Sequence, residues 1–224
     1  MLSKRLKAIA GLVPKGTRVA DVGTDHAYLP IYLVGEKIAA SAIATDINEG
    51  PLETARKNIT QKKAEKIELR LCDGLNKVSK NEVDTVIIAG MGGDNIIHII
   101  GEAPWLKEKG KTLVLQPMSS ADDLRRYLAK NGFETEKEVA VADSGKIYSV
   151  MLVKHTGKTA EPDLFESFVG KVYLEKTEEA KAYLKSVFSS LSKREKGIKN
   201  IKERKEEREE ILSALEKITK ILGE

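Results

Sequence analysis

Short apolar runs alternate with amphipathic stretches along the first two thirds of the chain. The first five runs are almost continuously apolar, as parallel strands buried on both faces should be. The last two runs are separated only by residues 143–146, Asp-Ser-Gly-Lys, which predicts a hairpin turn. The predicted strands are 18–22, 41–46, 67–72, 84–89, 112–116, 138–142 and 147–153. The predicted intervening helices are 30–39, 49–62, 95–101 and 121–131.

This alternation favours an α/β fold: a mostly parallel seven-stranded sheet with helices on both faces. A short helix over residues 2–12 precedes the sheet. It carries the basic residues Lys4, Arg5 and Lys7 on or near one face.

A change in composition after Gly157 predicts a second, all-helical unit. Apolar residues recur at helical spacing in 183–191 and again in 211–222, and the stretch between them is almost entirely polar. Because a single long helix would leave its apolar stripe exposed, we expect an antiparallel coiled-coil hairpin that turns near Gly197 or Asn200. The predicted domains are therefore 1–157 and 158–224.

Composition and charge narrow the class of protein. The 224 residues are 41% hydrophobic and 32% charged, which suits a buried core with a well-solvated surface. The single cysteine, Cys72, excludes an internal disulfide and a cysteine-rich zinc site, and the three histidines lack metal-ligand spacing, so no metal is expected. No signal-peptide block or membrane-spanning run appears, which favours a cytoplasmic protein without membrane contact. The net charge of +4 is compatible with a polyanionic partner.

The first predicted strand ends in a motif with the chemistry of a nucleoside site. Asp21 closes the strand, Gly23 permits a tight turn, and Thr24, Asp25 and His26 lead into a helix. A dinucleotide loop would have further glycines here and no added negative charge. The carboxylates instead suit S-adenosylmethionine, which carries an amino group and a positive sulfur. A plain tight turn is the alternative.

Acidic residues also follow the second and third strands. Asp46, followed by Ile47, is placed to hydrogen-bond the ribose hydroxyls of a nucleoside, a device that NAD enzymes share. In methyltransferases an acid at the end of the third strand commonly meets the exocyclic amino group of the cofactor's adenine. Asp73, followed by Gly74, stands at this position, although Asp-Gly is also an ordinary turn sequence.

A glycine-rich segment follows the fourth strand. Ala89 is followed by Gly90, Met91, Gly92 and Gly93, where methyltransferases of exocyclic amines carry an Asn/Asp-Pro-Pro-aromatic motif. The glycines predict a narrow slot that is lined by backbone and admits a flat base.

Arg125 and Arg126 lie on the helix after the fifth strand and are candidates for phosphate contacts, although adjacent arginines also occur on ordinary solvated faces.

Taken together, these motifs resemble the TrmK family, the bacterial tRNA (adenine(22)-N(1))-methyltransferases. The resemblance covers about the first 155 residues and depends on five motifs. They are residues 21–30 (Asp-Val-Gly-Thr-Asp-His-Ala-Tyr-Leu-Pro), 73–75 (Asp-Gly-Leu), 89–93 (Ala-Gly-Met-Gly-Gly), 115–117 (Leu-Gln-Pro) and 145–148 (Gly-Lys-Ile-Tyr). Met118 and Ser144 depart from residues that are usual in the family, an Asn and an acid.

The resemblance implies a Rossmann-like class I methyltransferase domain with a helical coiled-coil tail, and methyl transfer from S-adenosylmethionine to N1 of adenine 22 in tRNA. It places the cofactor near the ends of the first four predicted strands, and gives Asp25, His26 and the segment 90–93 catalytic roles. Lys4, Arg5, Lys7, Arg125 and Arg126 would contact tRNA, and a monomer is favoured. The cofactor-binding set is Asp21, Gly23, Thr24, Asp25, His26, Asp46, Ile47, Asp73, Gly74, Ala89, Gly90 and Met91.

Two other classes of protein remain compatible with the sequence. One is a methyltransferase of a small molecule or of another RNA, in which the tail would be a lid or a dimerisation element. The other is a non-catalytic RNA-binding protein that keeps the fold.

Overall fold

The computed structural model describes residues 2–223, and its centre is one seven-stranded sheet with the order β3-β2-β1-β4-β5-β7-β6. β1 through β5 are parallel, whereas β7 runs antiparallel to both β5 and β6. The parallel strands followed by a hairpin are therefore confirmed. The strands are β1 (Thr17–Val22), β2 (Ala39–Asp46), β3 (Ile67–Leu71), β4 (Thr85–Gly92), β5 (Thr112–Ser119), β6 (Phe133–Asp143) and β7 (Lys146–His155).

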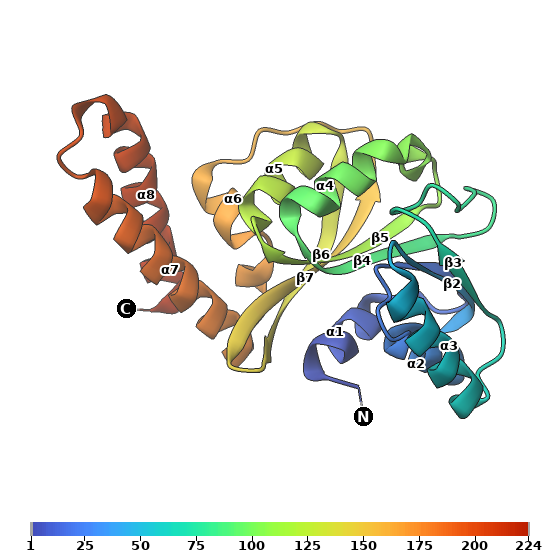
Figure 1. Ribbon diagram of the computed structural model, residues 1–224. Coiled ribbons are helices and arrows are strands. Elements are labelled where there is room, and N and C mark those ends of the chain that lie inside the picture. The colour runs from blue at the N-terminus through green and yellow to red at the C-terminus, as the bar shows by residue number, and fades with distance from the viewer. Residues whose placement is uncertain (1, 224) are drawn as a thin grey trace.

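Helices cover both faces of the sheet (Figure 1). On one side lie α1 (Lys4–Leu12), α2 (Tyr28–Gly35) and α3 (Glu49–Lys62). On the other side lie α4 (Gly93–Glu102) and α5 (Ala121–Lys130), with a short 3-10 helix, η1 (Pro104–Lys107), after α4. Two apolar clusters match this arrangement. One surrounds Ile88, Ile96 and Leu113, and the other surrounds Ile9, Leu33 and Ile87.

The main differences from the predicted elements lie at their ends. β4 continues three residues beyond its predicted end, through the glycine-rich segment, and β5 also continues three residues further than predicted. The reason is that β4 bulges around Gly90 and then resumes pairing with β5. α2 begins at Tyr28 rather than at residue 30, since the loop before it turns within residues 23–27. α3 has the bounds that the sequence predicts.

The tail contains more helices than the predicted pair. A short helix α6 (Leu164–Val169) and a 3-10 turn η2 (Val172–Leu174) precede α7 (Glu178–Ile198), the 3-10 turn η3 (Lys202–Arg204) and α8 (Lys205–Leu222). α7 and α8 form the predicted hairpin, which projects away from the sheet (Figure 1). Gly197 lies inside α7, whereas Asn200 lies in the connection.

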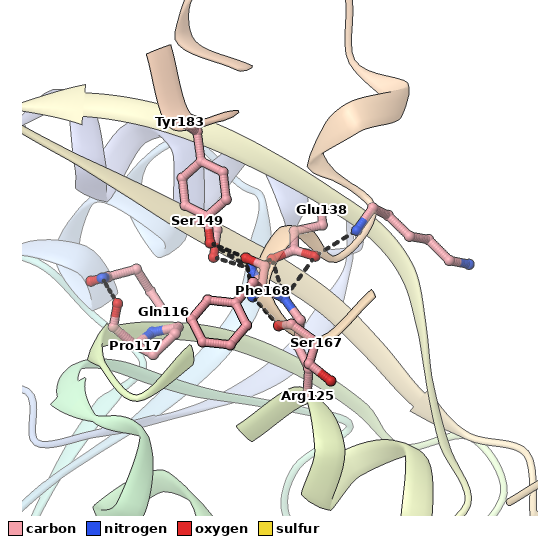
Figure 2. A network of polar contacts seen from close by, with 9 residues as sticks. Gln116, Pro117, Arg125, Glu138, Ser149, Ser167, Phe168 and Tyr183 are labelled. Carbon is pink, nitrogen blue, oxygen red and sulfur yellow. Dashed lines mark hydrogen bonds and ion pairs between the residues drawn. The ribbon is translucent and has the colours of Figure 1, made fainter. Parts of the chain in front are cut away.

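A buried polar network joins the tail to the sheet domain (Figure 2). The Arg125 guanidinium pairs with Glu138 at 2.6 Å and donates to Tyr183 Oη at 2.8 Å and to the Ser167 carbonyl at 2.7 Å. Arg125 is 6% exposed and Glu138 is 1% exposed. The prediction that Arg125 contacts phosphate is therefore wrong, because its charge is already paired and enclosed. The network also crosses the predicted domain boundary at residue 157.

Candidate functional site

Four segments meet at the carboxyl ends of the parallel strands and enclose a small cavity of about 100 Å³. They are the first turns of α1 and α2, the loop after β1, and the end of β4. The lining residues are Arg5, Leu6, Asp21, Gly23, Thr24, Asp25, His26, Tyr28, Leu29 and Ala89. The structure thus brings together the predicted β1 motif, one residue of the β4 motif and one cation of the N-terminal helix.

The loop after β1 is held in an uncommon backbone conformation. Gly23, Asp25 and Ala27 all have positive φ, at 69°, 55° and 56°. For the two non-glycine residues this conformation costs roughly 1–2 kcal/mol each. Gly23 also adjoins the Met91 side chain: a Cβ there would lie 2.2 Å from Met91 Cε, so Met91 would have to move. Strain of this kind tends to occur at ligand sites.

Asp21 is a buried carboxyl with one side-chain donor. Thr24 Oγ1 donates to its Oδ2 at 2.6 Å, and the residue is 5% exposed. Burial, with a smaller contribution from nearby Asp46, raises the pKa of Asp21 to about 7, although the Thr24 hydroxyl opposes the shift. An enclosed carboxyl of this kind gains its charge readily only beside a cation.

Asp46 stands at the end of β2 and fixes the loop beside it. Its Oδ2 accepts from the Asp25 backbone N–H at 3.3 Å, and its Oδ1 accepts from the Asn48 N–H at 2.9 Å. Each carboxylate oxygen retains a lone pair. Asp46 can therefore accept hydroxyl groups without releasing the loop.

Exposed apolar side chains lie beside Asp46. Ile47 is 61% exposed, and Leu71, the register partner of Asp46 on β3, is 44% exposed. Asp73 is exposed two residues after Leu71. Gly74 lies against α4, where a Cβ would lie 3.3 Å from Ile99 Cγ1. Ile47 and Leu71 thus both expose apolar side chains near Asp46. The sequence reasoning missed Leu71; the available signal was an apolar residue at the end of a predicted strand, two positions before Asp73.

His26 carries an unsatisfied buried nitrogen. Its Nδ1 is buried and has no hydrogen-bond partner among the described residues, while its Nε2 lies 3.4 Å from Asp25 Oδ2. The carbonyl of His26 accepts from Asn58 Nδ2 at 2.9 Å, which anchors the loop to α3. An unpaired buried polar atom in a ligand cavity indicates a missing partner.

The predicted slot is only partly open. The Met91 side chain crosses to Gly23, and Gly90, with φ 77°, forms the bulge of β4. Gly93 is buried, and a Cβ there would lie 2.3 Å from the Ser120 carbonyl, so close packing explains this glycine. Gly92 is less confined, with Ser119 Oγ 3.2 Å from the position of a Cβ. The opening for a flat ligand is therefore limited to the surroundings of Gly90 and Gly92.

Gln116 is a buried residue of the site to which the sequence reasoning gave no role. It is 0% exposed, and its Oε1 accepts from the Gly90 N–H at 3.1 Å and from Arg5 Nη1 at 2.7 Å. An amide inside an otherwise apolar strand was the signal that could have revealed it.

The remaining predicted cations lie apart from the cavity. Lys4 and Lys7 are exposed on α1. Arg126 Nη1 is 3.1 Å from carboxylate oxygens of both Asp122 and Asp123, on its own helix, so its charge is partly neutralised.

The observed groups fit S-adenosylmethionine. Asp21 and Asp25 offer anionic acceptors for a cation, Asp46 offers acceptors for a diol, and Ile47 and Leu71 offer a surface for a purine ring. Within residues 2–223 no cluster of three or more His, Cys, Asp or Glu side chains could hold a metal ion. In the same residues no helix has the length and apolar character to span a membrane.

Comparisons with known proteins agree with this geometry. A family model described as a methyltransferase domain matches residues 2–151. The tRNA (adenine(22)-N(1))-methyltransferase of Bacillus subtilis is 35% identical over 206 residues, with 86% of each chain covered. The solved B. subtilis m1A22 tRNA methyltransferase TrmK is 29% identical, with a TM-score of 0.82 and 99% of each chain covered. M. capricolum TrmK, solved with the cofactor product S-adenosyl-homocysteine, is 28% identical, with a TM-score of 0.78 over 100% of this chain and 98% of that one.

Proposed function

The chain belongs to the TrmK family of tRNA (adenine(22)-N(1))-methyltransferases, and we propose that it transfers a methyl group from S-adenosylmethionine to N1 of adenine 22 in tRNA. The single observation that supports this best is the junction at Gly90, where the carboxylate-lined cavity adjoins the glycine bulge of β4. A methyl donor in the cavity and a base at the bulge would be in contact.

The residues of the chain hold and orient the reactants. Asp21 and Asp25 would hold the cationic part of the cofactor and Asp46 its ribose, and Ile47, Asp73 and Gly74 would border its adenine. When bound, S-adenosylmethionine supplies a methyl group that its positive sulfur already activates. Correct placement of two reactants can lower a barrier by roughly 7–11 kcal/mol.

The acceptor nitrogen needs no general base before it attacks, because N1 of adenine has a free lone pair. The methylated base is cationic and later loses an N6 proton. Asp25, whose carboxyl is largely exposed at the cavity, stabilises that charge or accepts the proton, and His26 relays it from 3.4 Å away. The target base has to leave its stack to reach Gly90 and Gly92.

We further propose that tRNA contacts extend to exposed lysines outside the cavity. Lys4 and Lys7 lie on the helix that borders the cavity. In the tail, residues 193–208 contain eight Lys and Arg against four Glu, a net charge that equals that of the whole chain. The hairpin-tip lysines, Lys193, Lys196, Lys199 and Lys202, are all exposed. Such a cluster suits phosphate. A cytoplasmic monomer remains the expectation for this tRNA enzyme.

The test of the proposed function is transfer of labelled methyl groups to tRNA transcripts. We expect incorporation with a transcript that has adenine at position 22, and none with a transcript that has guanine there. Equal incorporation into both would contradict the site assignment. Incorporation into neither, with a labelled small molecule in a cell extract, would favour a small-molecule enzyme.

A further inference from the structure

Arg5 has a position that general binding of tRNA by α1 does not explain. Its backbone N–H donates to Asp143 Oδ2 at 3.3 Å, and Ser3 Oγ caps the helix by accepting from Leu6 N–H. The first turn of α1 is thereby fixed to the β6–β7 hairpin. This places the Arg5 side chain over the carboxyl edge of the sheet, where it lines the cavity with Asp21 and Asp25.

The guanidinium is held by neutral groups. Nη1 donates to Gln116 Oε1 at 2.7 Å, and the same oxygen accepts from the Gly90 N–H at 3.1 Å. Gln116 Nε2 donates to the Pro117 carbonyl at 2.8 Å, which fixes the amide. A Cβ at Gly90 would lie 3.3 Å from Arg5 Nη1, so the guanidinium lies against the bulge.

The charge of Arg5 has no carboxylate partner within ion-pair distance in the described part of the chain. Asp143 accepts from the Arg5 backbone N–H and interacts electrostatically with the Arg5 charge, but no ion pair joins its carboxylate to the guanidinium. Most other arginines of the described chain, by contrast, pair with an Asp or Glu: Arg18, Arg70, Arg125, Arg126, Arg194, Arg204 and Arg208. A guanidinium has five N–H donors, and Gln116 takes one of them. Arg5 is also only half-buried.

We propose that Arg5 binds an oxyanion of the reactants at the junction of the cofactor cavity and the Gly90 bulge. The reaction offers two such groups, the carboxylate at the amino-acid end of S-adenosylmethionine and a backbone phosphate beside the target adenosine. Both present paired oxygens that match the fork of a guanidinium. Because Gln116 Oε1 accepts from both Arg5 and Gly90, an anion bound to the Arg5 guanidinium would lie at a fixed position beside the bulge. The phosphate source rests on the proposed function, whereas the carboxylate source requires only cofactor binding.

The experiment compares wild-type protein with Arg5→Ala and Arg5→Lys, and uses Lys109→Ala as a control, since Lys109 is exposed at the opposite edge of the sheet. Calorimetry measures binding of S-adenosylmethionine and of its decarboxylated analogue. If the carboxylate is the anion, the wild type prefers S-adenosylmethionine by about 10- to 100-fold. Arg5→Ala removes that preference, and Arg5→Lys keeps part of it.

If a phosphate is the anion, the preference is the same in all variants and the change appears with tRNA. Arg5→Ala then raises the KM for tRNA and reduces the log–log salt slope of tRNA affinity by about 0.7 to 0.9. The proposal is overturned if Arg5→Ala changes neither the preference for S-adenosylmethionine over its analogue nor the salt slope of tRNA affinity. A fall in thermal stability alone would mean that Arg5 only supports Gln116. Failure of the proposed function is separate, since wild-type protein would not methylate tRNA at all.

Discussion

Protonation of Asp21 should control cofactor affinity near neutral pH. Burial holds the pKa of Asp21 at about 7, against an ordinary value of 3.8, and this difference corresponds to roughly 4 kcal/mol between the two protonation states. A cationic ligand favours the carboxylate, so binding below pH 7 has to release a proton. We expect affinity for S-adenosylmethionine to fall about tenfold from pH 8 to pH 6, because each pH unit below the pKa lowers it up to tenfold.

The assay is calorimetry at pH 6, 7 and 8 in two buffers of different ionisation enthalpy, which counts the protons released. Asp21→Asn should bind more weakly at pH 8 and show a flat pH profile. Glu102→Gln, which removes an exposed carboxylate far from the site, should keep the wild-type profile. Wild-type affinity that is flat from pH 6 to pH 8, with no proton release, would refute the reasoning.

The same shift affects the stability of the ligand-free protein. Between about pH 4 and pH 7 the folded state keeps a proton on Asp21 that the unfolded state has released, so this group makes folding less favourable as pH rises. The Tm of Asp21→Asn, measured relative to that of the wild type, should therefore rise between pH 5 and pH 8. A constant difference in Tm across that range would place the titration elsewhere.

Three further predictions concern the ribose contact, the slot and the tail. Asp46→Ala should weaken S-adenosylmethionine binding by about tenfold or more while the protein stays folded; calorimetry with unchanged affinity would misplace the ribose. Gly92→Val should abolish methyl transfer while cofactor binding survives, because a branched side chain occupies the opening beside Ser119; full turnover would mean that the loop is only a turn. Glutamine at all four hairpin-tip lysines should weaken tRNA binding and reduce its salt slope by up to about 0.9 per lost contact; an unchanged slope would move the contact surface to α1.

The tail test uses substitutions rather than removal of the tail because of the Arg125 network. A chain cut near residue 158 would lose the Ser167, Phe168 and Tyr183 partners of a buried guanidinium. The ion pair with Glu138 would remain, but it would be uncovered and would lose hydrogen bonds to a charged group, each typically worth roughly 1.5–3 kcal/mol. A truncated protein could then fail for reasons unrelated to RNA.

The sequence alone was sufficient to predict those elements that a short segment of neighbouring residues determines. Apolar runs predicted all seven strands, and the residues 143–146 predicted the hairpin. The acids at strand ends could be placed because parallel strands end at one edge of a sheet. Asp21, Asp25 and Asp46 do lie together there.

Contacts between distant segments could not be predicted in this way. The two adjacent arginines look equivalent in the sequence, yet the tail encloses Arg125 and leaves Arg126 partly exposed. This difference depends on how α6 packs on α5 and α7 on β6. Gln116 and Arg5 meet across 111 positions of sequence. No periodic pattern encodes that contact, which only the folded arrangement of α1 and β5 creates.

The most direct test of the account is the identity of the methylated nucleoside. The protein is incubated with labelled S-adenosylmethionine and an adenine-22 transcript, the tRNA is digested, and the labelled nucleoside is identified by mass spectrometry against standards. We expect N1-methyladenosine, located at position 22 by a block to reverse transcription. N6-methyladenosine, a methylated nucleoside at another position, or no label in tRNA would contradict it.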